Sequence, residues 1–291
     1  MADPSDHLIT ATAGNGIRIY AAVTTKLVEE ARRRHDCYPV ASAALGRTMT
    51  AALLLAANLK TAELLTVRIV GDGPLGEIIA DTTAQGTVRG MVGEPHLDLP
   101  LNAAGKLDVS KAVGQGNVFV TRFTKLKQPF TGSSALVSGE IAEDITQYLY
   151  TSEQTPSSVG LGVLVEPDLS VSAAGGFILQ ALPDADPSDL AVVESNLTKL
   201  SAVTTLIQES QSAKSLIEAA CQGLEIRYHA EQPLAFQCTC SRDRVEKALI
   251  STGTKELNEL IEIGEAELVC HFCGEKYQLN REELTALLKQ M

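Results

Sequence analysis

Four of the six cysteines form two tight pairs near the C-terminus, and the spacing within each pair is typical of a metal site. The first pair reads Cys238-Thr-Cys240, and the second reads Cys270-His-Phe-Cys273. Pairs separated by one or two residues can place their sulfurs about 2.3 Å from one Zn²⁺, and four thiolates complete a tetrahedron. The sequence therefore predicts one zinc ion per chain, held by Cys238, Cys240, Cys270 and Cys273.

The residues around these cysteines limit the chemistry of the site. His271 could replace one sulfur, although a residue between two ligands usually points away from the metal. A closed site of four thiolates leaves no coordination position for a substrate, so metal catalysis is not expected and no catalytic residue is predicted. Gly274, directly after the second pair, favours a tight knuckle whose backbone amides point at the thiolates. The alternative is two unrelated surface pairs, which the reactivity of exposed thiols makes unattractive.

The same cysteines could also react with an oxidant, because zinc keeps sulfur in the thiolate form that oxidants attack. Within each pair the sulfurs are close enough to form a disulfide, although a Cys-x-Cys ring is strained. A structural zinc contributes roughly 10–16 kcal/mol of apparent binding free energy in small peptides, whereas whole domains are stable by only about 5–15 kcal/mol. Oxidation of both pairs would therefore release the metal and unfold the region around it.

Residues 236–291 are predicted to form a small zinc-binding domain around the cysteines. Their patterns predict helices at 241–249 and 255–262, a hairpin of 268–269 with 276–279, and a last helix capped by Asn280 and Glu283. A region of roughly sixty residues is marginally stable by packing alone, so a metal cross-link is physically sensible.

Residues 1–183 are predicted to form an α+β core of mixed sheets and helices, because strands and helices come in separate blocks. An Asn-Gly pair between the first two strands favours a hairpin turn. The predicted strands are 8–12, 17–22, 65–70, 77–83, 86–92, 118–123, 135–138, 160–165 and 170–182, and the predicted helices are 24–35, 39–59 and 140–150.

One segment of this core matches a nucleotide-binding fingerprint, but its context opposes that function. Gly71-Asp-Gly73-Pro-Leu-Gly76 fits G-x-G-x-x-G. A phosphate-binding loop needs a helix after the glycines, whereas 77–83 has the pattern of a strand. We therefore predict a strand–turn–strand and no nucleotide site. No Ser-His-Asp arrangement emerges either, and the chain is not expected to be an enzyme.

Residues 184–235 are predicted to be a helical linker, which begins in a loop rich in proline and aspartate. Within 188–223, apolar residues recur at spacings of three and four, but Ser, Thr and Val are frequent and are mediocre helix formers. Such helices depend on docking onto another surface. The linker is therefore expected to be metastable and to lose its support when the zinc domain unfolds.

Composition opposes several classes of protein. Twenty-four basic and 36 acidic side chains give a net charge of −12, which opposes nucleic-acid binding because that affinity depends on neutralising phosphates. No apolar run reaches the roughly 18 residues of a membrane-spanning helix, so no membrane partner is expected. The N-terminus lacks the basic and apolar regions of a signal peptide, and clustered cysteines indicate metal or redox chemistry in a reducing compartment. A cytoplasmic protein is expected.

Several segments together resemble a known family. They are Ala41-Ser-Ala-Ala-Leu-Gly-Arg-Thr, Gly71-Asp-Gly-Pro-Leu-Gly, Ser152-Glu-Gln, Gly175-Gly-Phe-Ile-Leu-Gln and, most specific, Cys238-Thr-Cys240 with Cys270-His-Phe-Cys273. Over nearly its whole length the chain resembles the bacterial redox-regulated 33-kDa heat shock protein family of chaperones. It shows no departure from the family pattern at the four cysteines.

The resemblance implies a holding chaperone that needs no ATP and binds unfolding client proteins. Family members are inactive when reduced and zinc-bound, and oxidation with heat or a strong oxidant activates them. The family's disulfides join nearest neighbours, which here would be Cys238–Cys240 and Cys270–Cys273. The resemblance also implies an N-terminal α+β core, a metastable linker, a C-terminal zinc domain and a homodimer in the active state.

Two other functions stay open on the sequence alone. A zinc-ribbon nucleic-acid-binding protein is opposed by the net charge and by the absence of an aromatic–basic strand. A thiol–disulfide oxidoreductase places Cys-x-x-Cys at a helix N-terminus after a strand, whereas here a strand is expected after Cys273. The leading hypothesis is a redox-switched chaperone, in which the cysteines sense the oxidant and residues 188–235 respond.

Overall fold

The computed structural model describes residues 6–60, 63–124 and 128–290, and the chain folds into two compact units. The first unit spans Met1–Gln237 and the second spans Cys238–Met291. The segment 184–235, expected to be a linker, folds as part of the first unit. The two units have separate apolar cores, and each is described by itself.

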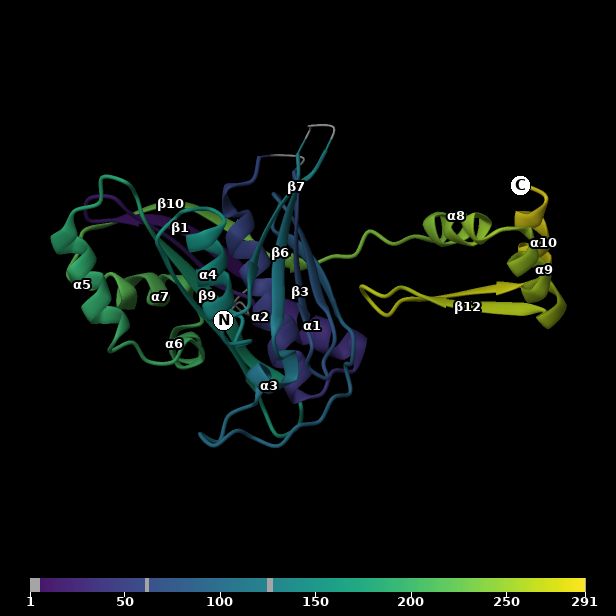
Figure 1. Cartoon of the computed structure of the whole chain (residues 1–291), viewed down its shortest axis with the longest axis horizontal. Helices are drawn as coiled ribbons and strands as arrows, with labels where there is room; N and C mark the ends of the chain where they lie inside the picture. Colours follow the sequence, from purple (N-terminus) through teal and green to yellow (C-terminus); the bar gives the residue numbers. More distant parts are fainter. Residues whose placement is uncertain (1–5, 61–62, 125–127, 291) are drawn as a thin grey trace. The chain divides into compact units, whose positions relative to one another are not determined.

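The first unit contains a five-stranded antiparallel sheet (Figure 1). In spatial order its strands are β10 (Ile226–Pro233), β1 (His7–Ala13), β2 (Ile17–Val23), β9 (Val171–Ala181) and β8 (Ser157–Val165). Strands β1 and β2 form the predicted hairpin, and its turn has Gly14 and Gly16 at positive φ. The strands predicted for 160–165 and 170–182 are also confirmed. Strand β10 was not predicted, because it lies in the segment expected to be helical.

A six-stranded sheet forms a second layer of the first unit. Its order is β11 (Ala235–Phe236), β5 (Thr87–Val92), β4 (Ile78–Thr83), β3 (Leu64–Gly71), β6 (Gly116–Phe123) and β7 (Phe130–Ala135). Neighbouring strands are antiparallel, except that β11 runs parallel to β5. A turn over 71–76 joins β3 to β4 without a helix, which confirms the predicted strand–turn–strand.

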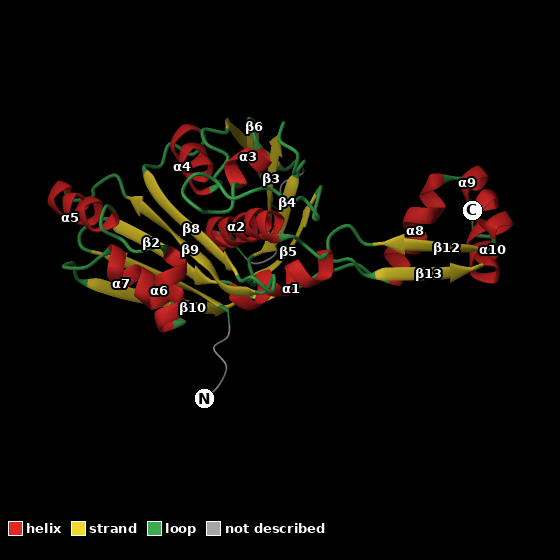
Figure 2. Cartoon of the chain, turned by 90° about the horizontal axis from the view of Figure 1, so that it is seen from below, coloured by secondary structure: helices red, strands yellow, loops and turns green. Residues whose placement is uncertain are grey.

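A long apolar helix lies between the two sheets (Figure 2). The helices of this region are α1 (Thr25–His35), α2 (Pro39–Leu55), the 3₁₀ turn η1 (Ala56–Asn58), α3 (Val109–Val113) and α4 (Ala142–Thr151). Helix α2 packs on β3, β4 and β5 of one sheet and on β2, β8 and β9 of the other. Its many alanines allow this close approach on all sides. Three of these helices were predicted, whereas the five-residue α3 was not.

The stretch Pro39–Asn58 is long and apolar enough to cross a membrane by length and composition, a property that the search for an uninterrupted apolar run did not bring out. Arg47, Thr48 and Thr50 interrupt the apolar run, but the mean hydropathy of the helix stays high. In the fold, 89% of its most apolar window is buried inside the protein. The stretch is therefore the core helix of the first unit.

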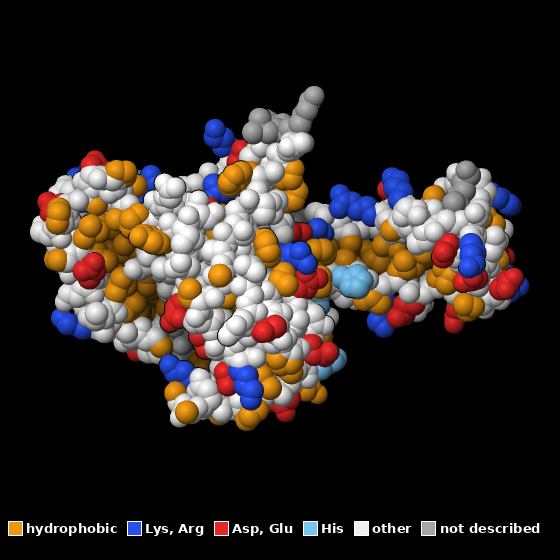
Figure 3. All heavy atoms as spheres, viewed as in Figure 1, with side chains coloured by type: hydrophobic (Ala, Val, Ile, Leu, Met, Phe, Trp, Pro, Cys, Tyr) orange, Lys and Arg blue, Asp and Glu red, His pale blue; other side chains and the backbone are white. Residues whose placement is uncertain are grey.

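Three short helices cover one face of the five-stranded sheet: α5 (Pro187–Leu197), α6 (Val203–Ser210) and α7 (Ala213–Ala220). Ile207, Leu216 and Ile217 are buried against β1, β2 and β9, in a core distinct from the one around α2. Helix α5 is less buried: Val192 is 36% exposed, and apolar side chains gather over α5 and α7 on the face shown in Figure 3. The helices predicted within 188–223 are confirmed, and they dock on this sheet.

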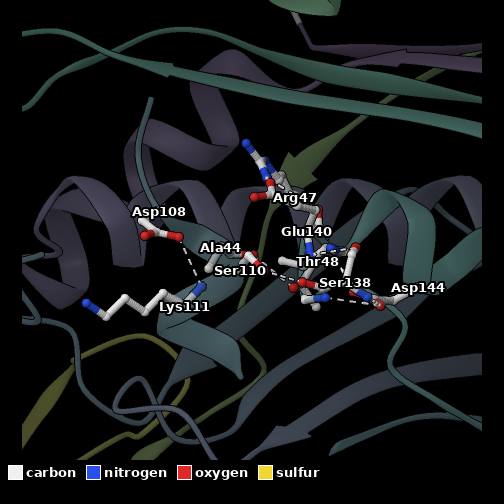
Figure 4. A network of polar contacts seen from close by, with 11 residues as sticks. Ala44, Arg47, Thr48, Asp108, Ser110, Lys111, Ser138, Glu140 and Asp144 are labelled. Atoms are coloured by element: carbon white, nitrogen blue, oxygen red, sulfur yellow. Dashed lines mark hydrogen bonds and ion pairs between the residues drawn. The ribbon is translucent and has the colours of Figure 1, made fainter. Parts of the chain in front are cut away.

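The buried carboxylate of Asp144 accepts hydrogen bonds from the loop before α4 (Figure 4). One oxygen of Asp144 accepts the backbone N–H groups of Val137 (2.8 Å) and Ser138 (3.1 Å), and the other accepts that of Ile141 (2.9 Å). The strand predicted for 135–138 was wrong for this reason. Strand β7 ends at the first of these residues. The N–H of Leu136 still donates to the carbonyl of Gly116 on β6, but those of Val137 and Ser138 donate to Asp144 instead of a neighbouring strand.

The second unit is built from two helices, a hairpin and a last helix. Its elements are α8 (Arg242–Thr252), α9 (Thr254–Ile263), β12 (Glu265–Val269), β13 (Lys276–Asn280) and α10 (Arg281–Leu288). The predicted capping box of Asn280 and Glu283 is present at the start of α10. Among its described residues, six form the buried apolar core: Leu249, Leu257, Ala266, Leu279, Leu284 and Leu287. So small a core is marginal without a cross-link.

Candidate metal centre

The structure brings the four cysteines of the two pairs together beside the turn of the β12–β13 hairpin. The Sγ of Cys238 lies 3.8 Å from that of Cys270, and the Sγ of Cys240 lies 3.4 Å from that of Cys273. All four sulfurs lie within 4.8 Å of one another. Sulfurs about 2.3 Å from one ion would be about 3.8 Å apart in a regular tetrahedron. The cluster therefore has the dimensions of a four-thiolate metal site.

The second pair sits in a tight turn between the two strands. The carbonyl of Cys270 accepts the N–H of Cys273 at 3.3 Å and that of Gly274 at 2.8 Å. Gly274 has φ +68°, which glycine adopts without strain. The backbone N–H of Phe272 donates to the sulfur of Cys270. That of Glu275 donates to the sulfur of Cys273, so the amides of the turn point at the sulfurs as the knuckle prediction requires.

The first pair is positioned by the start of α8. Ser241 caps this helix, since its hydroxyl accepts the N–H of Arg244 at 3.3 Å. The guanidinium of Arg244 donates to the carbonyl and to the hydroxyl of Thr239, each at 2.9 Å. Because Thr239 stands between Cys238 and Cys240, these bonds restrain the backbone from which the two sulfurs project.

Tyr277 on β13 contacts the cluster, although no pattern in the sequence indicated it. Its hydroxyl donates a hydrogen bond to the Sγ of Cys240 at 3.2 Å. This bond is the main reason that the pKa of Tyr277 is raised, so the hydroxyl remains a donor. Residues that hydrogen-bond metal ligands orient those ligands and tune the metal. Spacing could not identify Tyr277, because the length of the hairpin turn decides which β13 side chain faces Cys240.

The sulfur atoms form a donor set that suits a soft divalent cation. Burial raises the pKa of Cys270 and Cys273, while the backbone amides of the turn act in the opposite direction. Crowded thiols of this kind resist losing their protons unless a cation is close, and a bound divalent ion deprotonates them. Thiolate ligands favour zinc over harder ions such as Mg²⁺ or Ca²⁺. The residues present therefore fit a zinc ion.

His271 and the two other cysteines lie outside the cluster. His271 is exposed and is not among the grouped ligands, as predicted for a residue between two cysteines. Cys37 and Cys221 are buried in the first unit, where burial raises the pKa of Cys37 to about 12 and that of Cys221 to about 11. None of the six cysteines, all of which the structure describes, is in a disulfide.

Comparison with known proteins identifies the family. The sequence model of the family described as Hsp33 protein matches residues 6–280, a span that includes both cysteine pairs. The chain belongs to the Hsp33 family. The resemblance seen in the sequence is thereby confirmed.

Hsp33 relatives match the chain almost from end to end. The 33 kDa chaperonin of Desulforamulus reducens is 50% identical over 288 residues, which cover 98% of both chains. The 33 kDa chaperonin of Bacillus subtilis is 46% identical over 288 residues, covering 98% of this chain and 99% of that one. The crystal structure of the 33 kDa chaperonin (HSP33) of Thermotoga maritima has a TM-score of 0.90 at 35% identity, covering 99% of both chains. The predicted α+β fold is confirmed.

Proposed function

We propose that this Hsp33 protein is an ATP-independent holding chaperone that oxidation activates. Its relatives are named chaperonins, which supports the binding of unfolding client proteins. The observation that most supports a redox switch is the cluster of four sulfurs in a unit whose buried apolar core has six described residues. In this proposal the protein acts in the cytoplasm by binding rather than by catalysis, and it binds neither nucleic acid nor membranes.

The proposed ligands of one zinc ion in the reduced chain are Cys238, Cys240, Cys270 and Cys273. On oxidation each cysteine pair gives two electrons to a peroxide, which is reduced to water, and one S–S bond forms in each pair. By the family resemblance the bonds are Cys238–Cys240 and Cys270–Cys273. The contacts of 3.8 and 3.4 Å run between the pairs, so peptide mapping of the oxidised chain is needed to distinguish the two pairings.

Loss of the four thiolates removes the metal cross-link of the second unit. A structural zinc contributes roughly 10–16 kcal/mol in small peptides, which is as large as the whole stability of a typical domain, about 5–15 kcal/mol. The small core of this unit supports the expectation that it unfolds without the metal.

The segment proposed to unfold in response to oxidation is the linker, residues 184–235. The chain continues from it through β11 into the second unit. The helices of the linker have 11, 8 and 8 residues, below the roughly 12–15 that an isolated helix needs in water. Their stability therefore depends on docking to the sheet, and part of their apolar surface is exposed even when docked. Release of the linker uncovers apolar residues of β2 and β9, among them Ile17, Ile19 and Phe177. We propose that this surface holds clients and that the active form is a homodimer.

The experiment compares aggregation of a thermally unfolding client with reduced, zinc-loaded protein and with protein oxidised by peroxide. The variant Cys37→Ala/Cys221→Ala is the background, because it leaves only the four site thiols to be counted. The proposal expects strong suppression by the oxidised form, four thiols lost and one zinc released per chain. Equal suppression by the two forms contradicts the switch.

A further inference from the structure

Strand β10 is an edge strand that the linker adds to the sheet of the first unit (Figure 1). It pairs antiparallel with the whole length of β1. The N–H of Leu234 donates to the carbonyl of Asp6 at 3.0 Å, and at the other end the N–H of Gly14 donates to the carbonyl of Glu225 at 2.9 Å. Because β10 belongs to the linker, the proposed switch removes it from the sheet.

The side chains of β10 contribute little burial to this pairing. Six of its eight residues are exposed, whereas four of the seven residues of β1 are buried. His229 and Tyr228 make polar contacts with Thr12 and Glu218, but these contacts lie at the surface. Strand β10 is therefore held mainly by main-chain hydrogen bonds, which any extended polypeptide can form.

Strand β10 also carries features that protect a sheet edge, and β1 does not. It contains Arg227, Glu231 and Pro233, and a bulge interrupts its register near His229. Charges, proline and bulges on an edge strand oppose pairing with other chains. The sequence of β1, His-Leu-Ile-Thr-Ala-Thr-Ala, has neither proline nor a Lys, Arg, Asp or Glu. Departure of β10 thus replaces a protected edge with an unprotected one.

We propose that the edge of β1, once β10 has left, binds an extended segment of an unfolded polypeptide, which adds to the sheet as a strand. This inference rests on the proposed redox switch and adds a binding site at the edge of the same sheet. Recognition through main-chain N–H and C=O groups accepts many sequences, as a holding chaperone requires. In the reduced chain β10 occupies the edge, so the linker blocks the site.

In an antiparallel pair, the N–H groups of every second residue face the neighbouring strand. This alternation shows which amides of β10 bond to β1. The N–H of Leu234 faces β1, so the N–H groups of Gln232 and Ala230 face it as well, whereas that of Glu231 faces away. A change at the first two amides therefore blocks pairing with β1, and the same change at Glu231 is a matched control.

The probe is a fluorescent synthetic peptide with the sequence of residues 226–233, added to the full chain in its reduced and oxidised forms. Anisotropy is expected to show binding to the oxidised form and none to the reduced form. Methylation of the peptide's backbone nitrogens at Ala230 and Gln232 is expected to weaken binding at least about tenfold, because two main-chain bonds are lost. Methylation at Glu231 is expected to leave the affinity unchanged. The protein itself is not altered, so folding does not confound the result.

The outcomes separate this inference from the proposed function. Competition between the unmodified peptide and an unfolding client for the oxidised chain supports the edge as a client site. If the oxidised chain suppresses aggregation but binds no peptide, the inference is overturned and the proposed function stands. Equal weakening by methylation at either position also overturns it. An oxidised chain that neither suppresses aggregation nor binds the peptide overturns both.

Discussion

At the scale of single residues, the hydrogen bond from Tyr277 to Cys240 joins the hairpin to the first cysteine pair. A donor to a ligating sulfur stabilises the thiolate and holds its direction, and removal of such partners typically costs about 10–100-fold in metal affinity. The variant Tyr277→Phe is expected to bind zinc about tenfold more weakly, measured by competition with a chromogenic chelator. The control is Tyr150→Phe, which changes an exposed tyrosine of the first unit. Equal zinc affinity of both variants would show that the hydroxyl plays no part.

Asp6 predicts a pH dependence of stability in the first unit. It is 4% exposed, and burial raises its pKa from 3.8 to about 6, although it accepts the N–H groups of Lys26 and Leu27. The folded state therefore binds this proton more tightly than the unfolded state does. The resulting stabilisation is complete below about pH 4 and is lost as the pH rises through 6, and its size is on the order of 3 kcal/mol.

The variant Asp6→Asn removes the charge and keeps one acceptor oxygen. Urea unfolding of the first unit between pH 4 and pH 7 is expected to show a smaller loss of stability with rising pH than in the wild-type chain. The comparison uses the slope against pH, so a constant change in stability does not affect it. Identical slopes would mean that Asp6 does not titrate in this range.

At the scale of elements, the proposed switch requires that the docking of α7 keeps the linker folded on the sheet. Ile217 is fully buried against the five-stranded sheet, and truncation of a buried isoleucine to alanine typically costs about 2–5 kcal/mol. The variant Ile217→Ala is expected to expose Cys221 in the reduced chain, seen as faster alkylation in peptide mass spectra. Cys37, buried in the other core of the first unit, should stay protected. The same variant should suppress client aggregation without oxidant.

The matched control for this experiment is Val192→Ala, which truncates a partly exposed side chain of α5. Its Cys221 should react at the wild-type rate. If Ile217→Ala increases the alkylation of Cys221 without increasing aggregation suppression, linker release alone is not sufficient for activity.

A comparison of predicted and observed helices and strands shows which of them the sequence alone could locate. Apolar periodicity and turn signals located α1, α2, α4 and the β1–β2 hairpin, because local packing and local turn chemistry decide these. The sequence pattern could not predict β10, because its side chains are mostly exposed and show no alternation of buried and exposed positions. The strand is held mainly by main-chain hydrogen bonds to β1. The strand predicted for 135–138 was wrong because Asp144, six or more residues away in the chain, accepts the backbone N–H groups of Val137 and Ser138.

The candidate site was more predictable than its surroundings. Cysteine spacing alone indicated all four grouped sulfurs, because Cys-x-Cys and Cys-x-x-Cys fix sulfur positions locally. The partners of these sulfurs depend on tertiary structure. Neither the bond of Tyr277 to Cys240 nor that of Arg244 to Thr239 follows a spacing rule.

At the scale of the whole molecule, the central proposal is that oxidation of four cysteines in one unit frees a segment folded in the other. Hydrogen exchange of the full chain, with zinc content and thiol number measured on the same samples, tests it most directly. After all four site thiols are oxidised, the amides of α6 and α7 are expected to lose protection while those of α2 keep it. Full protection of α6 and α7 in zinc-free, fully oxidised protein would contradict the account.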